Sequence, residues 1–290
     1  MTLGAWIREA TARLAAAGRP AAPVEARRLA EAALRLSPVR LVLEDGRMLE
    51  RDERATLERL VTGRLAGTPL QYLLGRAAFR GLDLEVGPGV FIPRPETEGL
   101  VERVLPGLHR VAAHRPPRIL ELCVGSGAIL AALLTECPTA LGVGVELMAP
   151  AREFARRNLA AAGVAGRATL LAGDLYAPLA GVVAPGGFDL LVANPPYIPA
   201  AALPHLPADV RGFEPAEALD GGADGTDVIA RIATGAAAWL APGGRVALEI
   251  DESHGARVLE LLAAAAIVEL EIANDAAGRP RYALGEIHHS

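Results

Sequence analysis

The chain has few cysteines and no long uninterrupted apolar run. Of its 290 residues only Cys123 and Cys137 are cysteine, and neither stands in a Cys-x-x-Cys or Cys/His ligand spacing. Two cysteines are too few for a disulfide scaffold, and we expect no metal site. Charge or proline interrupts the alanine-rich stretches before they reach the roughly 20 apolar residues that span a bilayer. We therefore expect no membrane-spanning segment.

An excess of positive charge is also missing. The formal net charge is −5 at pH 7, which argues against a protein that grips nucleic acid by neutralising many phosphates. Residues 1–9 include Arg8 and Glu9, where a signal peptide would need an apolar core. These observations predict a cytoplasmic protein that makes no direct contact with nucleic acid or a membrane.

The first third of the chain is predicted to be helical. Apolar residues at helical spacing predict helices over 3–17 and 24–36, and a third that starts at Asp52 as its N-cap. An alternating segment over 79–86, with a glycine in its middle, predicts a hairpin. We expect a helical domain over 1–74, a hairpin and linker over 75–93, and a second domain over 94–290. The helical domain could recognise a partner, shape a cleft or simply stabilise the chain.

Strands and helices alternate in the rest of the chain. Short apolar runs predict strands over 118–122, 140–146, 168–172, 188–193, 245–250, 268–272 and 281–284. Helices are predicted over 96–105, 128–135, 149–162, 224–240 and 253–264. This alternation is typical of an α/β fold with a mostly parallel sheet covered on both faces. Ligands of such sheets bind at the carboxyl ends of the strands.

Two features at those strand ends suggest a nucleotide-like ligand. A glycine turn over 123–127 joins the first strand to a helix, so that a ligand can approach backbone N–H groups at the helix start. Glu146 ends the second strand, where a carboxylate commonly binds ribose hydroxyls, although an exposed strand-end acid is the alternative. The absence of a G-x-G-x-x-G fingerprint favours a methyltransferase over a dehydrogenase.

A third feature is the tetrad Asn194-Pro195-Pro196-Tyr197, which directly follows the strand over 188–193. Asn194 offers a side-chain carbonyl, the prolines offer carbonyls without N–H donors, and Tyr197 offers a flat aromatic face. This set suits a planar group that carries an –NH2. The alternative is a proline turn that closes the strand, with Asn194 as a cap. Because the tetrad shares the ligand edge of the sheet, we favour the amino-group pocket.

The segment over 91–98 is unusual for a linker. Two prolines flank Arg94, and Glu96 and Glu98 stand where a helix is predicted to start. One interpretation is a rigid linker whose acids complement the helix dipole. The other is a wall of the active site. Composition alone favours the linker.

Together these residues resemble class I S-adenosylmethionine-dependent methyltransferases, and more narrowly the release factor glutamine N5-methyltransferase family. The resemblance covers nearly the whole chain and rests on residues 69–72 with Gly75, 92–98, 125–127, 194–198, 214–222 and 278–281. It implies a seven-stranded, mostly parallel sheet whose last strand is antiparallel, joined by a β-hairpin to a small N-terminal helical bundle. It also implies methyl transfer from S-adenosylmethionine to the side-chain amide nitrogen (N5) of a glutamine in a peptide chain release factor.

The resemblance also assigns the site residues. It implies cofactor contacts for Glu121, Cys123, Val124, Gly125, Ser126, Gly127, Glu146, Asp174, Leu175 and Asn194. Asn194, Pro195, Pro196 and Tyr197 are implied to bind the substrate amide and carry the catalysis, and Arg94 and Glu96 to contact the substrate. No metal is implied, and the N-terminal bundle is expected to recognise the release factor.

The chain departs from the family pattern at several positions. Glu121 and Glu146 stand where aspartate is usual, and Cys123-Val124 replaces the more usual Gly-Thr or Cys-Thr. Asp251 and His254 replace a glycine and a glutamine, so no role is carried over to them. Two alternatives therefore stay open. One is the same chemistry on a small amide, an amine or a nucleobase, and the other is a non-catalytic binding protein.

Overall fold

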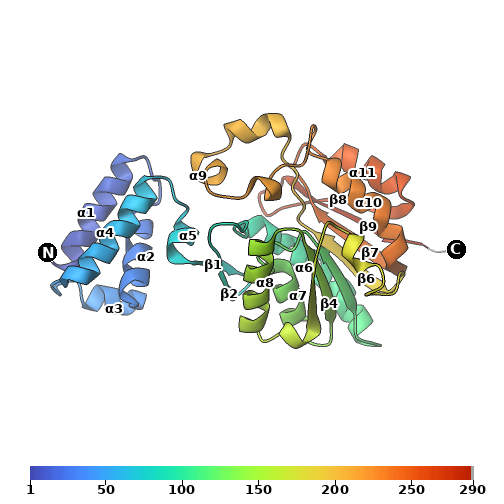
Figure 1. Cartoon of the computed structure of the whole chain (residues 1–290), viewed down its shortest axis with the longest axis horizontal. Coiled ribbons are helices and arrows are strands. Elements are labelled where there is room, and N and C mark those ends of the chain that lie inside the picture. The colour runs from blue at the N-terminus through green and yellow to red at the C-terminus, as the bar shows by residue number, and fades with distance from the viewer. Residues whose placement is uncertain (289–290) are drawn as a thin grey trace. The chain divides into compact units, whose positions relative to one another are not determined.

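The computed structural model describes residues 1–288, so the last two residues of the domain predicted over 94–290 lie outside the described part. Contacts divide the chain into two compact units (Figure 1). The first unit comprises Met1–Arg76 and Pro207–Phe213, and the second comprises the remainder of the chain. No helix within residues 1–288 is long and apolar enough to cross a membrane.

The first unit is a helical bundle. Its helices are α1 (Leu3–Ala16), α2 (Ala22–Leu34), α3 (Pro38–Leu43), α4 (Arg51–Leu65), α5 (Leu70–Leu74) and α9 (Ala208–Arg211). Trp6 and Leu14 of α1 pack with Leu29 of α2 and Leu57 of α4 in a separate apolar core. The three predicted helices are confirmed, whereas the short helices α3, α5 and α9 were not predicted.

The start of α4 differs from its prediction. Asp52 was expected to be the N-cap, but the helix begins at Arg51 and its N-cap is Glu50. The Glu53 carboxylate accepts a hydrogen bond from the Glu50 backbone N–H at 3.0 Å. Asp52 instead lies within the first turn, where its charge complements the positive end of the helix.

The predicted hairpin is confirmed. It consists of β1 (Arg76–Phe79) and β2 (Leu82–Glu85), joined by a turn at Arg80 and Gly81. Both turn residues have positive φ, 45° and 76°, the geometry of a two-residue turn that matches the twist of paired strands.

Helix α6 (Pro95–Ala112) continues seven residues beyond its predicted end at 105, since it passes through Pro106. A proline removes one helical hydrogen bond and frees the carbonyl four residues earlier. Pro106 and Glu102 are both exposed, so the freed carbonyl of Glu102 lies on the water-facing side of the helix. The prediction failed because it took the proline as a stop.

The second unit is built on a seven-stranded sheet. Its strands are β3 (Arg118–Leu122), β4 (Leu141–Glu146), β5 (Ala168–Ala172), β6 (Phe188–Ala193), β7 (Leu240–Glu249), β8 (Ile267–Asn274) and β9 (Pro280–Ile287). They lie in the order β5-β4-β3-β6-β7-β9-β8, and β9 runs antiparallel to both of its neighbours. This arrangement confirms the predicted α/β fold with an antiparallel last strand. Strand β7 begins five residues before its predicted start at 245.

Helices cover both faces of the sheet (Figure 1). One face packs against α6, α7 (Ala128–Glu136) and α8 (Ala149–Ala161), and the other against α10 (Asp227–Trp239) and α11 (Gly255–Ala264). Short 3₁₀ turns occur at Ala165–Arg167, Ala177–Leu179, Ala200–His205 and Ala216–Ala218. The chain moves outward from β3 to β4 and β5, then returns to β6 on the other side. A reversal of this kind places the ligand crevice at the carboxyl end of β3.

Candidate active site

A cavity of about 210 Å³ lies at the carboxyl ends of β3, β4, β5 and β6. The predicted site residues that line it are Glu121, Cys123, Val124, Gly125, Ser126, Glu146, Asp174, Leu175, Asn194, Pro195, Pro196 and Tyr197. Gly127, Arg94 and Glu96 are not among the lining residues. The fold therefore gathers residues from four separate strand ends into one place.

Gly127 shapes the cavity without lining it. It is the N-cap of α7, and its φ of 79° lies in the left-handed region that favours glycine. A Cβ at this position would lie 3.1 Å from the Cα of Ala155 in α8. The turn can therefore close against α8 only because this residue is glycine.

The Glu146 carboxylate is fixed by two backbone groups. Its Oε2 accepts a hydrogen bond from the Gly125 N–H and its Oε1 accepts one from the Met148 N–H, each at 2.8 Å. Each carboxylate oxygen keeps a further lone pair. The side chain therefore both ties the glycine turn to the end of β4 and can accept hydrogen bonds from ligand hydroxyls.

Glu121 is the most deeply buried acid of the cavity, with 1% of its surface exposed. Burial raises the pKa of its carboxyl well above the usual range, and the nearby charge of Glu146 raises it further. Its Oε2 has no hydrogen-bond partner within residues 1–288. A buried polar atom without a partner calls for a group that completes it, here a donor or a cation from a ligand.

Cys123 occupies a strained position in the same turn, with a φ of 58°. Burial raises the pKa of its thiol above the ordinary value, so the sulfur stays protonated near neutral pH. A protonated thiol is a poor nucleophile, and Cys123 therefore serves as a wall of the cavity.

An ion pair lies at the edge of the cavity. The Asp174 carboxylate is 2.5 Å from the Arg231 guanidinium, and both side chains are about half exposed. The neighbouring residues Leu175 and Val228 add apolar surface to the lining. Apolar walls beside polar groups suit a planar heterocycle.

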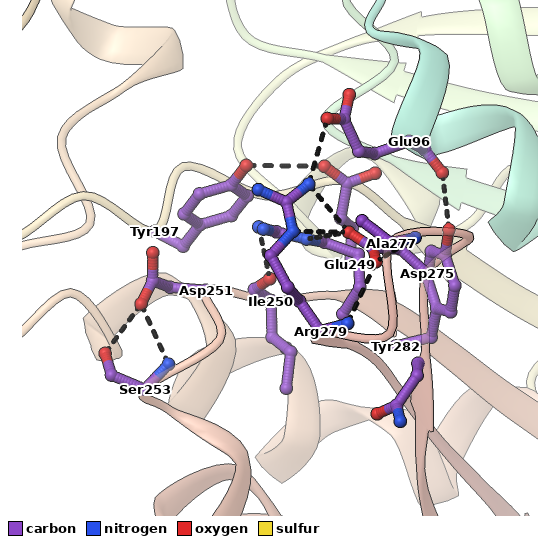
Figure 2. A network of polar contacts seen from close by, with 12 residues as sticks. Glu96, Tyr197, Glu249, Ile250, Asp251, Ser253, Asp275, Ala277, Arg279 and Tyr282 are labelled. Atoms are coloured by element: carbon purple, nitrogen blue, oxygen red, sulfur yellow. Dashed lines mark hydrogen bonds and ion pairs between the residues drawn. The ribbon is translucent and has the colours of Figure 1, made fainter.

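Asn194 and Tyr197 are each held by another side chain, Asn194 by Thr97, which lines the cavity, and Tyr197 by Glu249, which does not. The Asn194 Nδ2 donates to the Thr97 Oγ1 at 3.2 Å. The Tyr197 hydroxyl donates to the Glu249 Oε1 at 3.3 Å (Figure 2). Burial raises the pKa of Tyr197, so its hydroxyl stays protonated. Asn194 caps no helix, since the next helical turn begins at Ala200. With one Nδ2 hydrogen engaged by Thr97, the side-chain Oδ1 is the acceptor atom that this amide offers to a ligand.

Arg94 and Glu96 do not line the cavity, and each forms an ion pair with another side chain. Arg94 forms an ion pair with the buried Glu214, which also accepts from the Ile92 N–H at 3.3 Å. Glu96 accepts from Arg279 at 3.2 Å (Figure 2). Arg94 thereby ties the segment at Ile92 to Glu214, next to lining residue Pro215. Contact of Arg94 and Glu96 with a substrate stays a prediction.

Sequence reasoning gave no role to Thr97, Glu249, Arg231 or Glu214. Glu249 could have been found by the signal that identified Glu146, because both are acids that end a buried parallel strand. Arg231 lies in the middle of a helix and carries no such signal. Of the two family departures left without a role, Asp251 accepts hydrogen bonds from the Ser253 N–H and hydroxyl.

The strand order and the cavity position define a class I methyltransferase fold. A methyltransferase from Pyrococcus furiosus shares it with a TM-score of 0.50, at 19% identity over 72% of this chain and 90% of that one. The hMettl16 catalytic domain, solved in complex with a 3′UTR hairpin, gives a TM-score of 0.56 at 13% identity, over 80% of this chain and 82% of that one. At these identities the likeness shows the fold alone.

Sequence comparison narrows the class to one family. The PrmC N-terminal domain matches residues 5–75, and the methyltransferase small domain matches residues 105–204. The release factor glutamine methyltransferase of Moorella thermoacetica is 42% identical, over 97% of each chain. That of Mycolicibacterium smegmatis is 41% identical, over 95% of this chain and 94% of the relative. That of Bradyrhizobium diazoefficiens is 40% identical, over 94% of this chain and 91% of the relative. The chain belongs to the release factor glutamine methyltransferase family, as its sequence predicts.

Proposed function

We propose that this enzyme transfers a methyl group from S-adenosylmethionine to the side-chain amide nitrogen N5 of a glutamine in a peptide chain release factor, in the cytoplasm. One observation carries the proposal. Thr97 engages the Nδ2 of Asn194, so that Oδ1 is left to accept from an N–H group in the cavity. The name shared by its relatives supports glutamine as the acceptor.

The residues of the cavity fit S-adenosylmethionine, which supplies an electrophilic methyl group when it is bound. The unpartnered Oε2 of Glu121 would be completed by the ammonium of its methionine part. Glu146 would accept hydrogen bonds from ribose hydroxyls, and Leu175 with Asp174 would border the adenine. Glu121 and Glu146 are each one methylene longer than the aspartate usual in the family. Their side chains would extend further toward the ligand and would still present a carboxylate.

The tetrad would bind the acceptor amide. An amide nitrogen is a weak nucleophile, because its lone pair is delocalised into the carbonyl. The Asn194 Oδ1 and the Pro195 carbonyl would accept its two N–H bonds and increase its electron density, while the Tyr197 ring holds the amide plane. As the N–CH3 bond formed, the S–CH3 bond would break to leave the neutral thioether of S-adenosylhomocysteine, and one N–H proton would pass to water. Orientation of this kind can lower a barrier by up to about 7–11 kcal/mol.

We assign substrate recognition to the helical bundle of residues 1–74, with 75–93 as hairpin and linker and 94–290 as the methyltransferase domain. The bundle offers apolar surface for a protein partner. Val39, Val42 and Leu43 of α3 are 69%, 72% and 76% exposed. Exposed apolar clusters of this kind commonly mark contact surfaces.

A competition between acceptor classes tests the proposal. The enzyme is incubated with methyl-labelled S-adenosylmethionine and, in parallel, with a purified release factor, tRNA, DNA or small amides. Label is expected on the release factor alone. Label on nucleic acid or on a small amide would support the alternative acceptors instead. Cofactor binding without any transfer would support a non-catalytic binding protein.

A further inference from the structure

Glu249 lies directly behind the acceptor pocket. It ends β7, whose register pairs Leu248 with Ala193 of β6, so Glu249 stands beside the start of the tetrad. Its side chain is 1% exposed and does not line the cavity. Burial of a carboxyl group costs free energy unless hydrogen bonds or charged partners compensate for the lost water.

The contacts of Glu249 reach the two side chains assigned to the substrate amide. Its Oε1 accepts from the Tyr197 hydroxyl at 3.3 Å (Figure 2). The Thr97 side chain lies near enough to the same carboxyl to lower its pKa. Thr97 also accepts from the Asn194 Nδ2 at 3.2 Å. One carboxyl therefore stands behind both Asn194 and Tyr197.

The direction of these hydrogen bonds follows from the ionised carboxylate, which can only accept. If the Thr97 hydroxyl gives its proton to Glu249, its oxygen is free to accept from the Asn194 amide. Asn194 must then present its NH2 group to Thr97 and its Oδ1 to the cavity. A protonated Glu249 carries a donor of its own and imposes no such direction.

We propose that Glu249 is a positioning residue, which fixes the orientation of the Asn194 amide through Thr97 and that of the Tyr197 ring directly, so that both receive the acceptor amide. This inference rests on the proposed function for the identity of the acceptor. The inferred direction of the hydrogen bonds does not depend on the proposed function, because it can be measured without any acceptor.

Protonation of Glu249 falls in the physiological range. Burial raises the pKa of its carboxyl to about 7, although Thr97, Arg281 and Tyr197 oppose the rise. The titratable or charged groups that face it are Tyr197 from the loop after β6, Glu96 from α6, and Arg281 and Tyr282 from β9. Activity that depends on the carboxylate should therefore rise as pH increases through about 7.

The kinetic test uses Glu249→Gln, which keeps the shape and removes the obligatory acceptor. We expect kcat for release factor methylation to fall about 100-fold, the effect of a small misplacement of a reacting group. The KM for the release factor and the Kd for S-adenosylhomocysteine should change less than about twofold, and Tm should not fall. The rise in activity with pH near 7 should disappear.

Variants of Thr97 provide the matched comparison. Thr97→Val should reproduce the loss, Thr97→Ser should retain activity, and Thr97→Val combined with Glu249→Gln should cost no more than either change alone. Glu271→Gln, an exposed acid on β8 of the same sheet, is the control and should behave as wild type. Unchanged kcat in Glu249→Gln would overturn the proposal. Equal losses of cofactor affinity and Tm would also overturn it, by showing a merely structural role.

A second measurement separates this inference from the proposed function. In ¹⁵N-labelled enzyme without acceptor, the Asn194 side-chain amide signal, assigned from Asn194→Ala, should shift with a midpoint near pH 7. The shift should be absent in Glu249→Gln. If wild type methylates no release factor but the signal titrates in this way, the proposed function fails and the positioning role stands. A signal that ignores both pH and the substitution overturns the positioning role.

Discussion

At the scale of single residues, the site depends on buried carboxyl groups that the fold does not fully satisfy. Glu121 and Glu249 each keep one oxygen without a hydrogen-bond partner in the described part of the chain. Both end or nearly end a parallel strand, and burial raises the pKa of both. Buried carboxyl groups of this kind lower the stability of the folded chain. Their presence at one edge of the sheet therefore indicates a function in ligand binding or catalysis.

Glu146 makes the most direct prediction about the cofactor. Glu146→Ala removes the carboxylate that accepts from the Gly125 and Met148 N–H groups and leaves the glycine turn untied. A hydrogen bond to a charged group contributes about 1.5–3 kcal/mol, so the Kd for S-adenosylhomocysteine should rise roughly 10- to 150-fold. Isothermal titration calorimetry measures this change. The exposed substitution Glu271→Gln should leave the Kd unaltered, and an unaltered Kd in Glu146→Ala would contradict the assignment.

Glu249 makes a prediction about stability and pH. Its pKa of about 7 in the folded chain exceeds the ordinary 4.5. Between these values the folded state holds a proton that the unfolded state has released. The contribution of this group to stability is therefore greatest below pH 4.5, falls as pH rises to 7, and then levels off. Each pKa unit corresponds to about 1.4 kcal/mol.

Glu249→Gln removes this dependence. Relative to wild type, the variant should therefore gain stability between pH 5 and pH 8, and thermal unfolding at both pH values measures the gain. A difference between variant and wild type that does not change with pH would show that Glu249 titrates normally.

At the scale of elements, the glycine turn before α7 requires a glycine for two reasons that can be separated. Gly127→Ala places a side chain at a φ of 79° and 3.1 Å from the Ala155 backbone. Gly163→Ala meets the same restriction at 72°, but no atom lies within 4 Å of its Cβ. Left-handed geometry alone costs about 1–2 kcal/mol. Gly127→Ala should lose more stability than Gly163→Ala in urea unfolding and should also weaken cofactor binding. Equal losses would contradict the steric argument.

Within the helical bundle, a buried ion pair joins Arg64 of α4 to Glu25 of α2. The Arg64 Nε donates to the Glu25 carboxylate at 2.8 Å, and both side chains are at least nine-tenths buried. Glu25→Ala leaves the guanidinium charge buried without this partner and should destabilise the bundle by about 3–5 kcal/mol. Hydrogen exchange of the α1, α2 and α4 amides reports the loss. Glu25→Leu with Arg64→Met should recover most of it, whereas Glu153→Ala, which breaks an exposed pair, should have no measurable effect.

The sequence predicts elements best where local chemistry decides them. The strands over 118–122, 168–172 and 188–193 were predicted with their observed ends, because apolar runs stop there at turn-forming residues. The helix end at 105 was wrong because solvent exposure, which a sequence does not reveal, makes Pro106 tolerable inside α6. Thr97 was missed as a site residue for a similar reason. Its contact with Asn194 joins positions 97 residues apart.

At the scale of the whole molecule, the two units are not two consecutive pieces of chain. The segment Pro207–Phe213 lies in the sequence between β6 and α10, yet it belongs to the helical bundle. Within that unit Asp209 lies 3.4 Å from the Arg19 guanidinium and 3.7 Å from that of Arg64. No local sequence pattern predicts that this segment belongs to the helical bundle. The segment follows the tetrad by ten residues, which connects the bundle covalently to the loop that carries Asn194.

The central claim is that Asn194 receives an amide nitrogen, and the chemical position of the transferred methyl group tests it most directly. A release factor labelled by the enzyme is hydrolysed in acid, which cleaves an N-methyl amide to methylamine. Wild type is predicted to yield labelled methylamine, and Asn194→Ala is predicted to yield none while it still binds S-adenosylhomocysteine. Label that stays on a lysine or arginine, or undiminished methylamine from Asn194→Ala, would contradict the account.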